Sequence, residues 1–493
     1  MKNAKKLICM LLLVCLVIPV FASCTTKPVD TTANNDASTD TDSADTQDMS
    51  GVLEVPEKTF DGYEFTFFTG SNVSTCPYIF TADEEDNAID EAIYRRNLKI
   101  EDQYDITIKE IREVKDSASG AGAAYMKISA AYDSNDALYD AAVASAYDCG
   151  TLASGGMLSD LRNYGHINLE KNWWDQAANK QLTIYDRTYF TAGDISYIDD
   201  NFTYAIVFNK EMALSLQLED MYALVRNGKW TYDKLYELSK KATILDNDDA
   251  FSKGDVYGFL GYCDTIWMAF SSIGSTVASI NDQGNLALSL NSEKNFDMIT
   301  KWTEFGKSEP FLNWQLNKAA GNWKQVYADG QALFFGATID GIYKLRNTDV
   351  NYGFLPWPKH SEEQAEYNSG MAPNHISLFC VPLIGDDEHV ERASILIEAL
   401  GHGSDIVMDG FYEKNLKGKS VHDDESYETL DIIFANKVFD LGYYYNVGSY
   451  RWNMFTRFRD GLTTFASYYA EQEVAANKRI KEINDLYKGL LDR

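Results

Sequence analysis

The sequence lacks the residue patterns that catalysis and metal binding usually require. Its 493 residues include only 7 cysteines and 6 histidines, with no CxxC pair and no histidine spaced to complete a metal site. There is no GxSxG elbow, no HExxH motif and no Walker A loop, and Gly120-Ala121-Gly122 lacks the third glycine of a dinucleotide fingerprint. These absences favour a protein with no catalytic residues, no metal and no cofactor.

Basic side chains are also scarce. The chain carries 44 Lys and Arg against 74 Asp and Glu, a formal charge of −30. Removing residues 1–23 takes away Lys2, Lys5 and Lys6 and no acid, which leaves 41 basic side chains against 74 acidic ones. Nucleic acid is therefore excluded as an expected partner, because phosphate binding needs a surplus of Lys and Arg.

No aromatic residue occurs between residues 25 and 50, where Thr, Ser, Asn and Asp dominate. Such a stretch cannot bury enough apolar surface to offset the entropy lost on ordering, so residues 24–55 are predicted to be a flexible tether. The segment before it has a basic start, an apolar run over residues 7–21 that is too short to span a membrane comfortably, and small residues before Cys24. This order predicts a signal peptide over residues 1–23.

Residues 20–24, Val-Phe-Ala-Ser-Cys, resemble a lipobox, the signal at which bacterial lipoproteins are acylated on cysteine. Phe21 departs from the usual aliphatic residue. The resemblance implies lipidation of Cys24, such as by palmitate, and a membrane-anchored protein on the extracellular face of the cell membrane. The alternative is an ordinary secretory signal cleaved after Ala22 or Ser23, which would leave Cys24 as an incidental thiol.

Four other cysteines remain in the exported chain: Cys76, Cys149, Cys263 and Cys380. One or two disulfides are possible. Widely separated cysteines are more often buried thiols.

The first third of the folded region alternates between strand and helix patterns. A β-prone run ends at Gly70, and residues 87–104 have helical spacing. Residues 106–111 follow as a short strand, 121–132 as a helix and 138–144 as a buried strand. This order predicts an α/β unit with a mostly parallel sheet.

A second set of elements begins after Trp173. The sequence predicts strands over residues 188–195, 202–208, 332–336 and 375–381, a hairpin at 280–288, and helices at 296–305, 390–401 and most of 455–491. Thr231 is predicted to cap a helix that carries Leu235, Leu238 and Ala242 on one face.

Aromatic residues make up 13% of the chain, including 31 Tyr and 9 Trp. Tyr and Trp combine a flat apolar face with a hydrogen-bonding edge, which suits sugar rings and interfaces. The competing interpretation is that most of these side chains lie in the core.

The order of several short motifs over about 400 residues resembles the extracellular solute-binding proteins of ABC importers, and in particular the carbohydrate-binding family to which maltose-binding proteins belong. The motifs are Gly150-Thr151-Leu152 with residues 158–161; residues 189–195 leading into 206–210, with Phe208 in place of Tyr; residues 230–235, with Thr and Trp in swapped order; residues 282–284 with 291–292; residues 329–334; and residues 352–358.

The resemblance implies an α/β, two-lobed type II periplasmic-binding-protein-like fold with a ligand cleft between the lobes. Residues 56–198 and 357–405 would form lobe I, and residues 199–356 and 406–493 would form lobe II. The chain would cross between the lobes near residues 194–201 and again near 353–357. Hinge closure would then bury the ligand.

Loops at the carboxyl ends of strands are expected to face that cleft. The candidate ligand-binding residues are Gly70, Tyr147, Asp199, Asp264, Trp267, Thr338, Asp340 and Trp357. Each carboxylate would accept hydrogen bonds from sugar hydroxyls, and each Trp would stack on a ring face. The alternative for every one of them is a structural role, such as capping a helix or packing in a lobe.

The implied function is a receptor that captures a small solute, most simply a carbohydrate, and delivers it to the transmembrane permease of an ABC transporter. The resemblance implies a monomer that is not an enzyme. A secreted glycoside hydrolase would also be acidic, large and rich in aromatic residues, and a surface adhesin is a third possibility.

Overall fold

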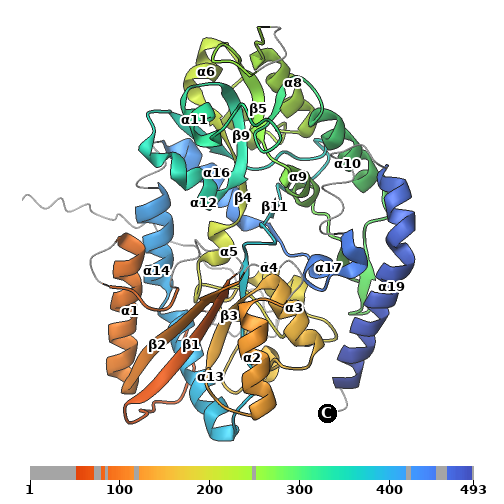
Figure 1. Ribbon diagram of the computed structural model, residues 1–493. Coiled ribbons are helices and arrows are strands. Elements are labelled where there is room, and N and C mark those ends of the chain that lie inside the picture. The colour runs from red at the N-terminus through yellow and green to blue at the C-terminus, as the bar shows by residue number, and fades with distance from the viewer. Residues whose placement is uncertain are drawn as a thin grey trace, which may run out of the picture. The chain divides into compact units, whose positions relative to one another are not determined.

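Two separate β-sheets organise the computed structural model of this chain (Figure 1). The structure describes residues 51–71, 79–83, 87–115, 121–246, 251–417, 423–450 and 464–490. These residues belong to one compact unit that starts at residue 49. The predicted signal peptide, Cys24 and Cys76 lie outside the described residues.

The first lobe is built on a four-stranded sheet in the order β12-β3-β1-β2. Its strands are β1 (Tyr63–Ser71), β2 (Ile106–Val114), β3 (Ala141–Ser145) and β12 (Ser377–Cys380). The three strands that come first in the chain run parallel, with Tyr63 opposite Ile106 and Phe67 opposite Ala141, and β12 runs antiparallel to β3. Most of β1 is buried, as expected for a parallel strand covered on both faces.

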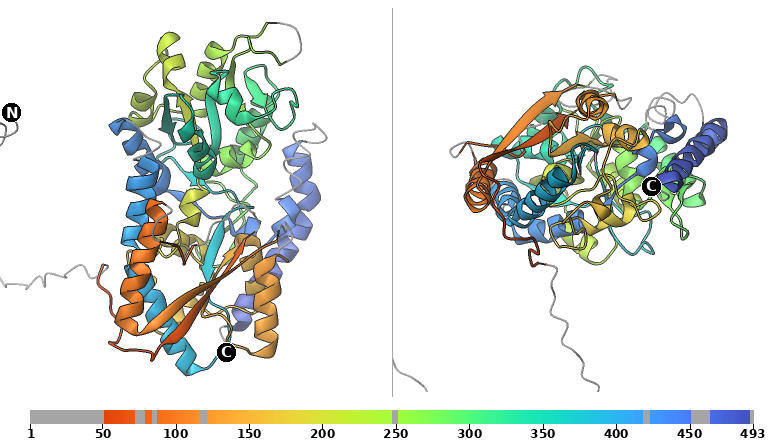
Figure 2. Two further views of the ribbon diagram at one scale, coloured as in Figure 1. Left: turned by 60° about the vertical axis from the view of Figure 1, so that its left-hand side comes forward. Right: turned by 90° about the horizontal axis from the view of Figure 1, so that it is seen from below.

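The helices of the first lobe flank this sheet, with α1 and α2 on opposite sides of it (Figures 1 and 2). They are α1 (Ala88–Tyr104), α2 (Ala123–Ser134), α3 (Ala146–Ser154), the short η1 (Leu161–Asn163), α4 (Gln176–Leu182), α13 (Asp387–His402), α14 (Asp405–Asp409) and the π-helix η3 (Gly410–Lys417). Both α14 and η3 pack against α1.

The second lobe is built on a five-stranded sheet in the order β10-β4-β9-β5-β8. Its strands are β4 (Tyr204–Asn209), β5 (Tyr257–Gly261), β8 (Phe311–Asn313), β9 (Ala332–Thr338) and β10 (Tyr352–Leu355). Strands β5, β8 and β9 are parallel, whereas β4 is antiparallel to both of its neighbours.

The helices of the second lobe follow its strands in the chain. They are α6 (Lys210–Ser215), α7 (Met221–Arg226), α8 (Tyr232–Ala242), α9 (Thr265–Ser272), α10 (Glu293–Phe305), α11 (Trp323–Ala328), α12 (Ile339–Tyr343), the short η2 (Lys344–Asn347) and α16 (Asp424–Ala435). The predicted hairpin is present as β6 (Ala278–Ile280) and β7 (Leu286–Leu288). Thr231 caps α8 as predicted, since its hydroxyl accepts the Lys234 amide at 3.3 Å.

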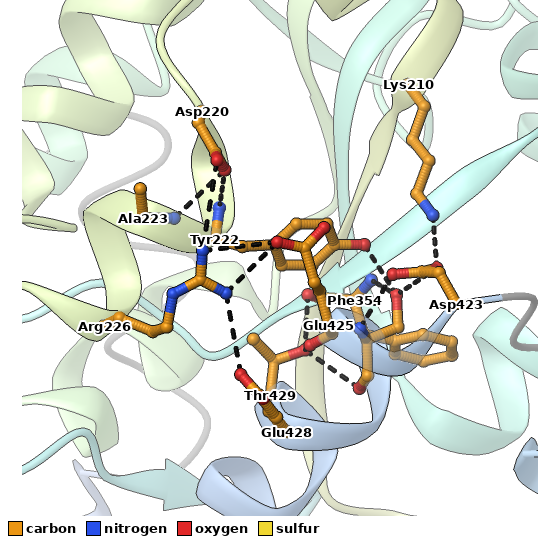
Figure 3. A network of polar contacts seen from close by, with 11 residues as sticks. Lys210, Asp220, Tyr222, Ala223, Arg226, Phe354, Asp423, Glu425, Glu428 and Thr429 are labelled. Atoms are coloured by element: carbon orange, nitrogen blue, oxygen red, sulfur yellow. Dashed lines mark hydrogen bonds and ion pairs between the residues drawn. The ribbon is translucent and has the colours of Figure 1, made fainter.

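A polar network fixes α16 onto the second lobe (Figure 3). The guanidinium of Arg226 on α7 reaches Glu425 at 3.2 Å and Glu428 at 3.6 Å. The hydroxyl of Thr429 donates to the Phe354 carbonyl of β10 at 2.8 Å. These contacts join α16 to α7 and to β10 of the five-stranded sheet. Although it comes late in the chain, α16 therefore belongs to the second lobe.

In the ranges that the structure describes, three segments connect the lobes. They contain the short helix α5 (Ile198–Asn201), β11 (Ser369–Gly370), and β13 (Lys437–Val438) followed by α17 (Leu441–Tyr444). β11 and β13 pair in parallel. The chain then continues through η4 (Val447–Ser449) to the long helix α19 (Phe465–Leu490). None of the helices in the described ranges is long and apolar enough to cross a bilayer.

Residues 188–195 do not form the predicted strand, so that prediction is wrong. Thr191 makes a single antiparallel bridge to Phe379, and Gly193 bridges to Trp174 and Ser196. A Cβ added at Gly193 would lie 2.5 Å from the Trp173 carbonyl oxygen. The chain therefore turns tightly against the neighbouring tryptophans, and an extended strand cannot continue there.

The crossing expected near residues 353–357 lies further along the chain. β10 is still part of the second sheet, and Lys359 pairs with Thr231 in the same lobe. Trp357 is buried against Trp302 with ring centroids 5.4 Å apart. Burial of that indole keeps the chain in the second lobe until β11.

Candidate ligand-binding site

The carboxyl ends of the parallel strands in each sheet face the space between the lobes. In the first lobe α3 begins directly after β3, and in the second lobe α12 begins directly after β9 and α9 a few residues after β5. Figure 1 shows α5, α9 and α12 in the band between the two sheets. Ligands of open α/β sheets bind at this edge, where helix starts and loops leave polar groups exposed.

An aromatic cluster, defined as Tyr147, Tyr204, Tyr262, Trp267 and Tyr443, lies where α3, α9 and α17 meet. Tyr443 stacks on Tyr147 with ring centroids 5.8 Å apart and an angle of 16° between the planes. Trp267 meets the same ring edge-on, at 4.9 Å and 85°. The cluster thus joins a helix start from each lobe through a tyrosine on the third connecting segment.

Asp264 adds a carboxylate to this cluster. It precedes α9 in the N-cap position, yet its side chain makes no cap hydrogen bond. Within the part of the chain that the structure describes, the carboxylate has no hydrogen bond and no ion pair. It is partly exposed, but the surrounding protein desolvates it enough to raise its pKa to about 6.

The charge of Asp264 affects the pKa of the tyrosines around it. Burial raises the pKa of Tyr204, Tyr262 and Tyr443, and the negative charge of Asp264 raises each of them further. Their phenols therefore stay protonated and can donate hydrogen bonds. The arrangement offers flat apolar faces, hydroxyl donors and one carboxylate acceptor.

A cavity of about 350 Å³, called here the α1–α12 cavity, is lined by elements of both lobes. Its lining comes from the start of α1, from α5, from α12 and η2, and from the π-helix η3: Asn87, Ile89, Asp90, Tyr197, Asn201, Ile339, Asp340, Tyr343, Arg346, Phe411, Asn415 and Leu416. The volume is within the range of small-molecule sites.

The π-helix shapes one wall of the α1–α12 cavity. Asn415 accepts a hydrogen bond from the Tyr343 hydroxyl, and Phe411 packs against Tyr197 with ring centroids 5.5 Å apart. π-Helices are rare and occur frequently at functional sites, because the wider turn re-aims side chains. Here it directs the Asn415 amide towards Tyr343 of α12 in the opposite lobe, and the Phe411 ring towards Tyr197 at the start of α5.

Asp199 lies in the connecting region. It belongs neither to the aromatic cluster nor to the lining of the α1–α12 cavity. Lys437 Nζ lies 2.7 Å from Asp199, 2.7 Å from Asp200 and 2.8 Å from Asp175. Burial raises the pKa of Asp199 to about 7, although the charge of Lys437 opposes that rise. Burial lowers the pKa of Lys437, but the carboxylates outweigh it and hold that pKa well above its usual value.

Three other predicted site residues have structural roles. A Cβ at Gly70 would lie 2.6 Å from that of Ala124, so this glycine permits close packing of α2 on β1. Thr338 caps α12, with its hydroxyl accepting the Gly341 amide at 3.2 Å. The indole of Trp357 is fully buried in the core of the second lobe.

The structure thus brings Tyr147, Asp264 and Trp267 together, and puts Asp340 in the lining of the α1–α12 cavity, paired with Lys344 at 2.7 Å. Sequence reasoning missed Tyr204, Tyr262 and Tyr443. Tyr262 directly follows β5, so the rule used for Tyr147 would have found it if a strand had been predicted over residues 257–261. The run of three tyrosines at 443–445, soon after a connecting strand, is a signal that could have pointed to Tyr443.

The described residues contain no group of three or more His, Cys, Asp and Glu side chains that could hold a metal ion. Cys149 and Cys380 are buried free thiols, and Cys263 is a partly exposed one. Burial raises the pKa of the Cys149 thiol well above its usual value, so this group is not reactive.

No protein-family model matches the sequence, and no curated protein matches it. Among solved structures, the chain is similar to the cyclic alpha-maltosyl-1,6-maltose binding protein from Arthrobacter globiformis, at 13% identity over 85% of this chain and 99% of that chain, with a TM-score of 0.55.

It is also similar to a cyclo/maltodextrin-binding protein complexed with maltotetraose, at 13% identity over 86% of this chain and 96% of that one (TM-score 0.54). An ABC substrate-binding protein from Listeria monocytogenes in complex with cycloalternan matches at 13% identity over 87% and 100% (TM-score 0.52). The predicted fold class is confirmed: the chain has the two-lobed α/β fold of ABC solute-binding proteins.

Proposed function

We propose that this protein is an extracellular receptor that captures a sugar or oligosaccharide between its lobes and delivers it to an ABC permease. The observation that carries the proposal is the aromatic cluster with Asp264, built from a helix start in each lobe. Aromatic faces cover the apolar face of a sugar ring, while the carboxylate and the phenols exchange hydrogen bonds with its hydroxyls.

The similar structures support this proposal, since their ligands are maltotetraose, cycloalternan and a cyclic maltosyl-maltose. The two-lobed fold supplies a mechanism as well. Bending of the three connecting segments would open and close the space, and closure would exclude water from the ligand. The Lys437 cluster is the buried anchor on which two of these segments meet.

Anchoring at the membrane is part of the same proposal. The predicted lipidation of Cys24 would hold the receptor at the extracellular face of the cell membrane, and the predicted tether would let a monomer reach its permease. Labelling of growing cells with an alkyne palmitate analogue tests this step. Incorporation should disappear in a Cys24→Ser variant, and labelling that persists there would contradict the anchor.

The binding experiment uses the exported chain, residues 24–493, with Cys24→Ser. Thermal unfolding is measured with a panel of mono- and oligosaccharides, because a ligand that binds only the folded state raises the apparent stability. Trp267→Ala should abolish the shift. Trp323→Ala is the matched control, since Trp323 stacks on Phe335 outside the space between the lobes.

A secreted glycoside hydrolase is the competing function. It would release reducing ends from the same oligosaccharides over time, whereas a receptor returns its ligand unchanged. No shift with any sugar would count against the carbohydrate receptor, and steady release of reducing ends would replace it with the hydrolase.

A further inference from the structure

The carboxylate of Asp264 is left without a compensating charge. Its pKa is raised by burial, and no lysine, arginine or histidine in the described ranges offsets that effect. The charge of Asp264 raises the pKa of the phenols of Tyr204 and Tyr262 and, from the third connecting segment, that of Tyr443, so these groups lie near it. A charge that is removed from water without a partner lowers the stability of a folded protein.

Several other desolvated carboxylates in this chain are compensated internally. Asp199 has Lys437 at 2.7 Å. Asp148 accepts backbone amides of Gly122 at 2.8 Å and Tyr125 at 3.1 Å. Asp440 accepts the Val277 amide at 2.8 Å. Asp264 lies at a helix start, where it could accept backbone amides in the same way, but its side chain makes no cap hydrogen bond. Its carboxylate therefore remains available to a ligand.

The aromatic rings near Asp264 and the net charge of the chain also favour the binding of a cation. Aromatic rings attract a positive charge to their faces, and the buried rings of Tyr147, Trp267 and Tyr443 pack on one another near the start of α9. The chain's formal charge of −30 adds a long-range attraction for cations. A carboxylate beside aromatic faces is the chemistry that recognises an ammonium group.

We infer that the aromatic cluster takes a positively charged group, so that the ligand is an amino sugar or an oligosaccharide that carries a protonated amine. This inference rests on the proposed function, and it narrows the ligand class of the same site. The ammonium would sit against Asp264 and the aromatic faces, while the uncharged part of a longer ligand would extend towards the α1–α12 cavity. A neutral sugar could offer hydroxyl groups to the carboxylate, but on closure it would leave the negative charge uncompensated.

The test compares matched pairs of ligands by isothermal titration calorimetry at pH 7.5. The probes are 6-amino-6-deoxymaltotriose and the trimer of glucosamine, each against its N-acetylated form, with maltotriose as the neutral parent. The protein is the exported chain with Cys24→Ser. We expect at least one free amine to bind about 30-fold or more tightly than its N-acetylated form, the loss typical of removing one partner of a buried charge pair.

Asp264→Asn identifies the carboxylate as the cause. This nearly isosteric change should reduce the affinity for the amine to that for its N-acetylated form. Asp282→Asn is the control for net charge, since Asp282 lies exposed in the β6–β7 turn. It should leave the preference for the amine intact.

Two results would overturn the inference and leave the receptor proposal standing. One is that a neutral or N-acetylated sugar binds as tightly as the amine. The other is that Asp264→Asn weakens both kinds of ligand equally, which would make Asp264 an acceptor for hydroxyl groups. Failure of every sugar in both series would overturn the inference together with the proposed function.

Discussion

Asp199 at the junction of the lobes and Asp264 in the aromatic cluster are two desolvated aspartates in opposite surroundings. Lys437 lies 2.7 Å from Asp199 and pairs with two further carboxylates beside it. Asp264 has no basic partner in the described part of the chain, and aromatic rings surround it. A carboxylate that the protein compensates belongs to the fold, whereas one that it leaves uncompensated is available to a ligand.

Lys437→Met should produce the largest effect, because it leaves three buried carboxylates facing one another. Breaking a buried ion pair from one side costs about 3–5 kcal/mol of unfolding free energy. Chemical denaturation followed by far-UV circular dichroism measures it. Lys344→Met removes a half-exposed partner of Asp340 and should cost less than about 1 kcal/mol. Equal losses in the two variants would contradict the contrast between the junction and the surface.

A second change at the junction should restore part of this loss. Asp199→Asn in the Lys437→Met background removes one of the uncompensated charges, and we expect it to recover about 1–2 kcal/mol of unfolding free energy. The same denaturation experiment on the double variant measures the recovery. An additive further loss would show that Asp199 contributes through its packing and not through its charge.

Asp264→Asn should stabilise the ligand-free protein at pH 7. The desolvated carboxylate has a pKa of about 6 in the folded chain, against about 4 when unfolded, so its ionised form destabilises the fold. Since the side chain is partly exposed, we expect a gain of about 1–2 kcal/mol in unfolding free energy, measured by chemical denaturation. A destabilised variant would show that Asp264 has an internal partner.

The pH dependence of that gain gives the smallest and most specific signal. A carboxyl whose folded pKa is raised binds more protons when folded, so its contribution to stability falls as the pH rises from about 4 to about 6. Wild type and Asp264→Asn should therefore have similar stability near pH 4 and differ most at pH 7. A difference that stays constant from pH 4 to pH 7 would rule out titration of Asp264 as its cause.

The sequence predicted most of the helices and strands because local periodicity encodes them. The buried strand ending at Gly70, the helix over residues 87–104 and the hairpin near Gly284 are all present within a few residues. The strand predicted over residues 188–195 was wrong, because close packing against Trp173 and Trp174 overrides the β-prone composition. The crossing predicted near residues 353–357 lies further along the chain, and the other predicted lobe boundaries stay a prediction.

Part of the candidate site was predicted, because local sequence patterns locate some of its residues. Tyr147 follows the strand predicted over residues 138–144, so a strand prediction locates it from neighbouring residues. Asp264 follows β5, which was not predicted, and it was named only as a carboxylate suited to sugar hydroxyls. Trp357 satisfied a similar rule, yet it lies in a lobe core, since the position of the second crossing depends on packing. Tyr443 was missed because its partners Tyr147 and Trp267 are far from it in the sequence.

By itself the sequence determined the two-lobed α/β class, the acidic character and the expectation of an exported, lipid-anchored receptor, since these follow from composition, local patterns and motif order. Only the tertiary structure decided which carboxylate is compensated. Lys437 is separated from Asp199 by 238 positions, and no local pattern predicts that these two side chains meet. The same packing leaves Asp264 beside aromatic rings with no such partner, and that difference separates a structural aspartate from a candidate ligand-binding one.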